Sequence, residues 1–478
     1  MEASGLWMLA AVAVLLLVTG LPAWIVLLGV ALGFAALGVA LGVFTSSLLG
    51  ALYSRLVGLL ENDLLQALPL YVLIGALVNR LPLADILFRA ARQGFAPTHR
   101  ATPLAGLGLG VLLAPMSGSV GASVAMLSRI VYPRMAARGF PEDRNVALVC
   151  VASTLGVVVP PSLVLILLGD AMLRAHTEAA NIAGLTGRIV NTQDVFHAAL
   201  IPAALILALC AGIAAWQGDR EPADAPATAL SRGEWLTALA AASLIVALLA
   251  GVALGYLYAV EAAAAGGVAL VVHGIASRTL ERAVLEQALR DTIAVTGALF
   301  ALLVAATFFT LVQRAFGTDR WLAAAFAHSG AGPHAMLAGV LFAMALCAVV
   351  LDAFEMIFVV IPLLIPPLLT RIPDAPWVAV LTLLILQASF LVPPFGYAVL
   401  MARGRLRSAL SSGELARALL PYVAAQLLVL ALVIAFPGML WRDASFAVSQ
   451  PAPAPALSDD AMRDMFEKQL QRESAAPK

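Results

Sequence analysis

The chain has 478 residues, of which 62% are hydrophobic and 12% are charged, about half the charged share of an ordinary soluble domain. Its 28 basic and 28 acidic residues give a net charge of zero, so nothing indicates binding of a polyanion through bulk charge. A soluble chain of this length needs a charged shell over its core, whereas a lipid bilayer accepts apolar surface directly. The composition therefore excludes a soluble enzyme, a nucleic-acid binder and a disordered scaffold.

Apolar stretches of membrane-spanning length recur from one end of the chain to the other. The first of them, from Leu6 to Val18, follows no basic segment, so we expect a membrane helix there instead of a cleaved signal peptide. We predict spans at 6–20, 22–43, 65–79, 145–172, 196–216, 235–251, 257–273, 291–312, 377–402 and 418–438. Two further apolar regions, at 103–131 and 335–367, are interrupted by glycine, proline or polar residues.

The connections between these spans differ in their content of arginine. Seventeen arginines lie in one alternating set: 80, 89, 92, 100, 129, 134, 138, 144, 220, 232, 278, 282, 290, 403, 405, 407 and 417. The other set holds six: 55, 174, 188, 314, 320 and 371. By the positive-inside rule the first set faces the cytoplasm. The connections at 45–63, 173–195, 313–334 and 370–376 are then predicted to face outward.

Two apolar segments, one in each half of the chain, are interrupted in the same order. In the first half Ser117-Gly118-Ser119 interrupts the segment, a basic turn follows, and the next apolar helix is broken at Pro160-Pro161-Ser162. In the second half Asp352 and Glu355 interrupt the segment, a turn follows, and the next helix is broken at Pro393-Pro394-Phe395-Gly396. The charge pattern puts the first turn inside and the second outside, as an inverted repeat requires.

The physics of the membrane restricts where such breaks can lie. Backbone exposed to hydrocarbon must be hydrogen-bonded, so an unwound stretch persists only against protein or a water-filled cavity. A double proline removes amide hydrogens and leaves carbonyl groups unpaired. Unpaired carbonyls and hydroxyls suit a hard cation such as sodium, and exposed helix N-termini suit a carboxylate. Paired interruptions in two halves of a membrane protein therefore indicate the binding site of a transporter.

Each interruption also has a structural explanation. A proline in a membrane helix commonly produces only a kink, and Ser117 and Ser119 can bond backbone carbonyls four residues earlier. Asp352 and Glu355 share one helix face and indicate an ion pathway, because a carboxylate inside the membrane is costly. The structural alternative for these two acids is a buried pair tied to an arginine.

Glycine recurs in the apolar segment before the first interruption, at Gly106, Gly108 and Gly110. A glycine-rich phosphate loop needs a strand before it, and the sequence predicts none there. Small residues let neighbouring membrane helices approach closely. We therefore expect these glycines to serve close packing of the hairpin.

The joint order of these motifs resembles the large (permease, DctM-type) membrane subunit of tripartite ATP-independent periplasmic (TRAP) transporters. Ser117-Gly118-Ser119 followed by Pro133-x-Met135-x-x-x-Gly139-Phe140 resembles its first re-entrant hairpin, and Ser153-Thr154-Leu155-Gly156 through Pro160-Pro161-Ser162 its first broken helix. Leu351-Asp352-x-x-Glu355 with Pro362 resembles the second hairpin. Leu386-Gln387-x-Ser389-Phe390-Leu391-x-Pro393-Pro394-Phe395-Gly396 resembles the second broken helix, in the form of the mannitol/chloroaromatic-like subgroup.

The resemblance departs from the family at two positions. Val120-Gly121 stands where the family often has a second serine, and Tyr258-Ala259-Val260-Glu261 keeps only the acid of a Thr-Pro-Thr-Glu run. Both differences concern the exact ion ligands more than the fold.

The resemblance implies an all-α polytopic membrane protein with about ten spans plus two re-entrant hairpins in an inverted repeat, an ion-transporter-like elevator fold. It implies sodium-coupled uptake of an organic acid anion across the bacterial inner membrane, with sodium as the coupling ion and no other cofactor. A small four-helix membrane subunit and a periplasmic substrate-binding protein are the partners that it implies. The ion ligands predicted on this basis are Ser117, Gly118, Ser119, Asp352, Ser389 and Pro393, and the substrate-binding residues are Pro160, Pro161, Ser162, Glu355, Pro394 and Gly396.

We divide the chain accordingly into scaffold and transport units. The predicted units are N-terminal scaffold helices (1–100), a first hairpin and broken helix (101–172), an outward loop with central scaffold helices (173–334), a second hairpin and broken helix (335–402), a last membrane helix (403–441) and a polar Pro/Ala-rich tail (442–478). In the tail, Ser458 is expected to cap a short helix.

Two other functions compete with this interpretation. The first is a proton-coupled organic-anion transporter or exporter of related fold that acts without a binding protein. The second is an intramembrane enzyme, which would need paired catalytic residues on facing helices. Asp352 and Glu355 stand instead on one short segment, and the sequence has no His-x-x-x-His or Gly-x-Ser-x-Gly motif. We therefore expect a transporter and no enzyme.

Overall fold

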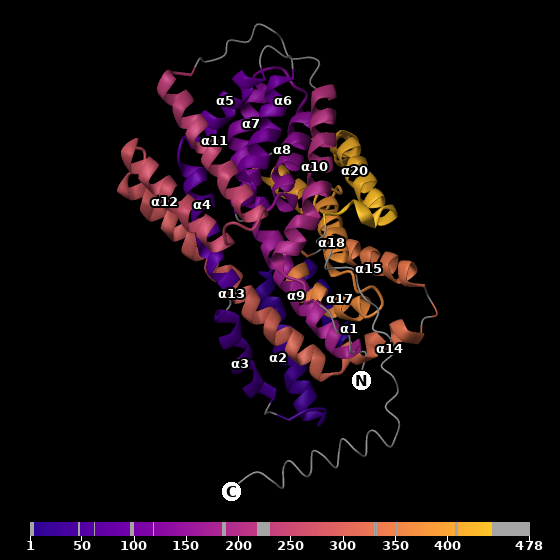
Figure 1. Cartoon of the computed structure of the whole chain (residues 1–478). Helices are drawn as coiled ribbons and strands as arrows, with labels where there is room; N and C mark the ends of the chain where they lie inside the picture. The colour runs from indigo at the N-terminus through magenta and orange to yellow at the C-terminus, as the bar shows by residue number, and fades with distance from the viewer. Residues whose placement is uncertain are drawn as a thin grey trace, which may run out of the picture.

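A computed structural model describes residues 4–45, 48–61, 63–95, 100–117, 119–183, 188–217, 230–328, 330, 332–349, 351–406 and 410–441 of the chain. Within these ranges the protein is helical and has no strand. The predicted tail helix after Ser458 lies outside the described residues. The helices form an N-terminal group, two repeated units and a central group between the two units (Figure 1).

The N-terminal group contains α1 (Ser4–Thr19), α2 (Ala23–Ala40), α3 (Leu48–Leu60), α4 (Asp63–Arg80) and α5 (Leu83–Gly94). Two of these helices, α3 and α5, occupy stretches that the charge pattern predicts as loops. That prediction was wrong for α5 because its charges lie on one face of a helix. Its other face buries Leu83, Leu87 and Phe88, the apolar spacing of an amphipathic helix.

The first repeated unit contains α6 (Ala101–Leu113), η1 (Pro115–Ser117), α7 (Val120–Ala136), α8 (Glu142–Val158), α9 (Leu163–Ala183) and α10 (Thr192–Gln217). The second contains α15 (Pro333–Cys347), α16 (Ala353–Glu355), the π-helix η2 (Met356–Val360), α17 (Ile361–Leu369), α18 (Ala375–Ser389), α19 (Tyr397–Leu406) and α20 (Ser412–Ala435), followed by η3 (Pro437–Met439). The central group is α11 (Arg232–Ala253), α12 (Ala259–Ala276), α13 (Arg282–Ala315) and α14 (Thr318–His328).

The two units make matching contacts, which confirms the predicted inverted repeat. In each unit the first hairpin arm packs on the first half of the broken helix, α6 on α8 and α15 on α18. The second arm packs on the broken helix of the other unit, α7 on α19 and α17 on α9. Each interruption also contacts a scaffold helix, η1 on α4 and η2 on α13. Figure 1 places α5 to α8 at one end of the molecule and α14, α15 and α17 towards the other.

Both predicted helix breaks are present at the double prolines. The first broken helix ends its first half at Val158 and resumes at Leu163, with a bend of 41° between α8 and α9. The second ends at Ser389 and resumes at Tyr397. The bonds Pro160–Pro161 and Pro393–Pro394 are both cis. Proline cannot donate to the helix ladder, so the chain leaves the helix at these points.

Six helices in the described ranges are long and apolar enough to cross a membrane, or eight if each of two bent pairs is one span. The bent pairs are α4 with α5, at 71°, and α8 with α9. The sequence predicts about ten spans because it also counts α1 and the pair of α18 and α19. Those helices are shorter, at 16 residues for α1 and 15 for α18.

Three ion pairs of the described residues each join two distant parts of the chain that are predicted to lie on the same side of the membrane. Arg80 pairs with Asp291 at 2.5 Å, and Arg89 with Glu234 at 2.5 Å, all in the arginine-rich set of connections. Arg314 pairs with Glu178 at 2.6 Å in the other set. The contacts therefore agree with the two-sided division read from the arginines.

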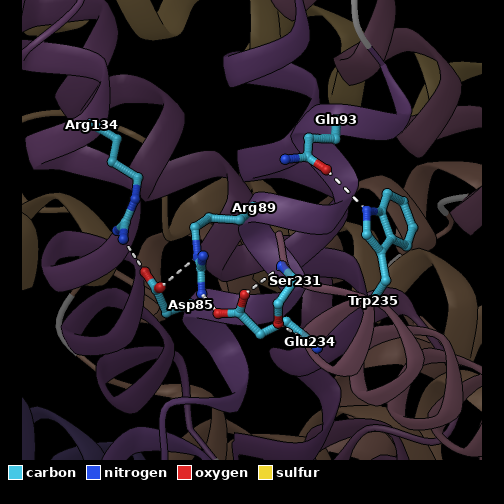
Figure 2. A network of polar contacts seen from close by, with 7 residues as sticks. All are labelled: Asp85, Arg89, Gln93, Arg134, Ser231, Glu234 and Trp235. Atoms are coloured by element: carbon cyan, nitrogen blue, oxygen red, sulfur yellow. Dashed lines mark hydrogen bonds and ion pairs between the residues drawn. The ribbon is translucent and has the colours of Figure 1, made fainter. Parts of the chain in front are cut away.

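Helix α5 fastens the first hairpin to the scaffold. Asp85 pairs with Arg134 of α7 and, at 3.0 Å, with Arg89 of its own helix. Arg89 in turn pairs with Glu234 of α11. Figure 2 shows this chain of contacts, with Arg134 on one side of α5 and the α11 residues on the other. The polar face of α5 thus carries a network of ion pairs.

Two glycines allow the first hairpin to lie directly against α8. A Cβ on Gly110 would collide with the backbone of Ala152, and a Cβ on Gly156 would lie 2.7 Å from the nitrogen of Pro115. The predicted close packing is confirmed for Gly110 and for Gly106, whose Cβ would lie 2.8 Å from Val131 Cγ1. It is wrong for Gly108, which has nothing within 4 Å.

We predict that Gly110→Ala destabilises the protein whereas Gly108→Ala does not. Both glycines lie inside α6, so the gain in helix propensity is the same, and the difference isolates the collision with Ala152. Overpacking of this kind costs about 1–3 kcal/mol. Thermal unfolding of the purified protein in detergent measures the difference, and equal melting temperatures for the two variants would contradict the packing.

Candidate functional site

The tip of the first hairpin is formed by the turn between η1 and α7. Ser119 is the N-cap of α7, and its hydroxyl oxygen accepts a hydrogen bond from the amide of Ala122 at 3.1 Å. The hydroxyl of Ser123 donates to the carbonyl oxygen of Ser119 at 3.2 Å. The cap formed by Ser119 therefore holds the start of α7 at the hairpin tip. Gly118 and the side chain of Ser117 lie outside the described residues.

The helix break at the first double proline is bridged by hydrogen bonds from the next residue, Ser162. The hydroxyl of Ser162 donates to the carbonyl oxygen of Val157 at 2.7 Å and accepts from the amide of Leu165 at 3.1 Å. One side chain thus joins the end of α8 to the start of α9. It pairs backbone groups that Pro160 and Pro161 would otherwise leave open in an apolar surrounding.

The hairpin tip and the broken helix enclose a small cavity between them. Its volume is about 10 Å³, close to the space of one water molecule or one small cation. Four hydroxyl-bearing residues contribute to its lining: Ser119, Ser123, Ser153 and Ser162. The structure thus brings together two residues predicted for different roles, Ser119 for the ion and Ser162 for the substrate.

The interruption of the second hairpin is a reciprocal capping box. Asp352 Oδ1 accepts from the amides of Phe354 at 2.9 Å and Glu355 at 3.0 Å. Glu355 Oε2 accepts from the amide of Asp352 at 3.0 Å. Among the described residues neither acid is paired with an arginine, as the structural alternative would require. Each carboxylate keeps its second oxygen free of hydrogen bonds to the described part of the chain.

The second double proline sits in a tight turn between α18 and α19. The hydroxyl of Ser389 donates to the carbonyl oxygen of Ile385 at 2.8 Å, within its own helix. A Cβ on Gly396 would lie 2.5 Å from the carbonyl oxygen of Phe390, so only glycine fits this approach. Pro393 and Pro394 lie between these two residues and separate the two half-helices.

Tyr397 connects the two halves of the site, and the sequence reasoning missed it. A Cβ on Gly121, next to the first hairpin tip, would lie 3.2 Å from Tyr397 Oη. The same phenol lies within electrostatic range of Asp352 and Glu355 in the second hairpin. Its position directly after the second break is the only sequence signal that marked it.

Gln387 is a second residue that the reasoning did not assign to the site. Its side chain is fully buried, and neither its amide nitrogen nor its oxygen has a hydrogen-bond partner in the described structure. An unpaired buried amide costs about 1–3 kcal/mol, so such a group commonly serves a ligand or a water molecule. The motif Leu386-Gln387-x-Ser389 contained the signal.

The arrangement of hairpins and broken helices indicates a class of protein. Two membrane-embedded units of opposite orientation each carry a re-entrant hairpin and a broken helix, and their polar groups meet in the interior. Half-helices with exposed ends at a repeat interface are the architecture of secondary transporters.

Comparison with known proteins gives the family. The family model of the tripartite ATP-independent periplasmic transporter, DctM component, matches residues 9–439, and the chain belongs to this family. The C4-dicarboxylate TRAP transporter large permease protein DctM of Rhodobacter capsulatus is 26% identical over 216 residues, 44% of this chain and 48% of that protein. The sialic acid TRAP transporter permease protein SiaT of Haemophilus influenzae is 24% identical over 432 residues, 87% of this chain and 66% of that protein. The large permease protein SiaM of Vibrio cholerae is 23% identical over 429 residues, 88% of this chain and 94% of that protein.

Two solved structures share the fold. The YdaH transporter of Alcanivorax borkumensis aligns with a TM-score of 0.59 at 19% identity, over 83% of this chain and 88% of that one. MtrF of Neisseria gonorrhoeae, whose structure illustrates a class of antimetabolite efflux pumps, aligns with a TM-score of 0.58 at 13% identity, over 82% and 83%. At these identities the likeness concerns the fold alone.

We predict that Asp352→Ala lowers the stability of the protein by about 0.5–2 kcal/mol, whereas Asp352→Asn preserves it. Alanine loses both capping bonds at the start of α16, and asparagine caps as well as aspartate does. Thermal unfolding in detergent compares the two variants. Equal losses for both would show that the charge of Asp352, and not its capping oxygen, holds the hairpin.

Proposed function

We propose that the chain is the membrane-embedded large subunit of a secondary transporter that imports an organic acid anion with sodium, with substrate delivered by a binding protein. The observation that carries the proposal is the cavity of about 10 Å³ between the first hairpin tip and the first broken helix. A space of this size with hydroxyl groups and half-helix ends around it suits a small hard cation.

The two ion sites are proposed at the two hairpin–broken helix pairs. The first uses Ser119 and its neighbours Ser117 and Gly118 at the hairpin tip. The second site uses the free oxygen of Asp352, the hydroxyl of Ser389 and carbonyl groups near Pro393. It also includes Gln387, because the side-chain amide of this residue is buried without a hydrogen-bond partner in the described structure. Both sites combine oxygen ligands with helix ends, the chemistry that alkali cations need inside a membrane.

The substrate is proposed to be a carboxylate held between the two breaks. Helices α7, α9 and α19 begin at the interruptions, and helix N-termini favour anions. The relatives with named substrates are permeases for C4-dicarboxylates and for sialic acid, both carboxylates. Ser162, Pro160, Pro161, Glu355, Pro394 and Gly396 remain the residues proposed to line this position.

The transport step is proposed to be an elevator movement of the hairpin units against the scaffold. Each interruption rests on one scaffold helix, η1 on α4 and η2 on α13, which gives each unit a surface to slide along. A small membrane subunit and a periplasmic binding protein are the proposed partners, as the names of TRAP permeases imply.

One observation favours the proton-coupled alternative. Asp352 and Glu355 lie together in the membrane interior without an arginine among the described residues, and such acids occur in proton relays. An exporter of this kind would act without a binding protein.

We predict that Asp352→Asn raises the half-saturating sodium concentration for uptake by roughly tenfold to a hundredfold, the effect of losing one charged ligand. Because asparagine keeps the cap, the variant separates ion binding from folding. The measurement is uptake into proteoliposomes holding this chain and its small subunit, with the binding protein outside. A C4-dicarboxylate and sialic acid serve as probes.

An inward sodium gradient is compared with potassium in its place, with and without the binding protein. Uptake that needs both sodium and the binding protein supports the proposal. Uptake indifferent to sodium sinks it and favours the proton-coupled alternative, and unchanged sodium dependence in Asp352→Asn removes that residue from the site.

We predict that Gln387→Leu lowers sodium-driven uptake without loss of stability, whereas Gln426→Leu leaves uptake unchanged. Gln426 of α20 is a similarly buried amide with no hydrogen-bond partner in the described structure, but it stands on a helix that contains neither break. Replacing an unpaired buried amide with an apolar side chain is neutral or stabilising by about 1–3 kcal/mol. Full uptake by Gln387→Leu would show that the amide is not a ligand.

A further inference from the structure

A separate cavity of about 320 Å³ lies at the corner where α4, α5 and α7 meet. It is distant in sequence from both helix breaks, and nothing in the transport cycle proposed above uses it. Three arginines line it, Arg80, Arg129 and Arg134, against one acid, Asp85. The cavity therefore has an excess of positive charge.

Two of the three arginines are held by the protein itself. Arg134 pairs with Asp85, donates to the carbonyl oxygen of Ile130 at 2.5 Å and lies with its guanidinium 5.3 Å from the centre of the Phe88 ring. Figure 2 shows the pair of Arg134 and Asp85. Arg80 donates to Gln287 at 2.6 Å and pairs with Asp291 at 2.5 Å.

The third arginine, Arg129, is exposed and has no hydrogen bond or ion pair with the described part of the chain. It lines the cavity from α7, opposite Arg80 at the end of α4. Asp291 and Asp85 compensate the charges of Arg80 and Arg134, so the excess positive charge of the pocket lies on Arg129, whose five N–H donors are available to a ligand. Arginine is the side chain best suited to the bidentate recognition of phosphate.

The level of the cavity relative to the membrane indicates the source of its ligand. Arg80 is the last residue of the apolar helix α4, and the arginine distribution places this end of the molecule in the cytoplasm. The pocket thus lies at the level of the lipid headgroups. Basic pockets between membrane helices on this side bind the phosphate groups of anionic lipids.

We propose that this pocket binds a phosphate group, and that its depth favours the headgroup of an anionic phospholipid of the cytoplasmic leaflet over free phosphate. The bound phosphate would accept from Arg129 of the hairpin unit and lie beside Arg80 of the scaffold. It would therefore join two elements that the protein otherwise connects here through α5. The proposal does not depend on the transported substrate or on the coupling ion.

The test is a binding titration on the purified full chain in detergent, read by the shift in melting temperature. Short-chain phosphatidylglycerol, phosphatidylcholine of the same chain length and inorganic phosphate are the three probes. Phosphatidylglycerol is expected to raise the melting temperature and phosphatidylcholine is not. Arg129→Gln is expected to weaken the phosphatidylglycerol effect roughly fivefold, the contribution of one basic residue near an anionic surface.

Arg282→Gln is the matched control. Arg282 is an exposed arginine at the start of α13, it belongs to the same arginine-rich set of connections, and it does not line the cavity. It should respond like the unmodified protein, and Arg129→Lys should retain part of the effect. Stabilisation by inorganic phosphate that Arg129→Gln abolishes would support the phosphate site and assign it to a soluble ligand. No stabilisation by either anion, or an equal phosphatidylglycerol effect in Arg129→Gln and Arg282→Gln, would overturn the proposal.

Discussion

The requirement that buried backbone groups find hydrogen-bond partners governs this structure more than any other interaction. A membrane helix can be broken only where protein replaces the lost bonds. Here the replacement is local and specific: the Ser162 hydroxyl bonds backbone groups on both sides of the first break, and the Asp352–Glu355 capping box starts α16 at the interruption of the second hairpin. Where such partners are in place, the chain can present carbonyl groups, hydroxyls and helix ends in the membrane interior. The same constraint that makes broken helices rare makes them suitable for holding ions and anions.

The second constraint is close approach between the hairpins and the broken helices. Gly110 and Gly156 let the first hairpin touch α8 through backbone atoms, and Gly396 lets the second break turn on itself. The result is a cavity with space for about one small ion and little more. A larger apolar groove of about 380 Å³ lies between α4, α11 and α12, where Met116 of the first hairpin faces the scaffold. The polar space and the apolar boundary thus lie on different sides of the same hairpin tip.

Much of the fold was predictable because proline and arginine act locally. The double prolines at 160–161 and 393–394 predicted the helix breaks. The distribution of arginines predicted which connections lie on each side of the membrane, and the ion pairs Arg89–Glu234 and Arg314–Glu178 agree with it. Helix α5 was missed because its charges suggest a loop unless the apolar face beneath them is counted. The capping box was visible in the sequence, because an acid three residues before a glutamate follows the capping-box spacing. The same two acids also indicate an ion pathway, because a carboxylate inside the membrane is costly.

The rest of the site depends on contacts between segments that are far apart in sequence. The meeting of Gly121 with Tyr397, 276 positions later, follows from the packing of α7 on α19, which no local pattern encodes. The lack of a hydrogen-bond partner for Gln387 in the described structure likewise depends on its neighbours. The sequence of an apolar helix does not show which groups from other helices surround a glutamine. The roles of the predicted ligands therefore stay predictions, although the structure shows which of them lie together.

The proposed transport step moves the hairpin units against a fixed scaffold. Met116 at the first hairpin tip and Ile74 on α4 line the same groove, and both lie within 3.6 Å of the Cβ position of Gly266. A thiol cross-linker joining cysteines at these two positions, in a background without Cys150, Cys210 and Cys347, should abolish proteoliposome uptake until it is cleaved. The single variants Ile74→Cys and Met116→Cys, treated with the same cross-linker, should keep their uptake. Full uptake with Ile74 and Met116 cross-linked would contradict the account.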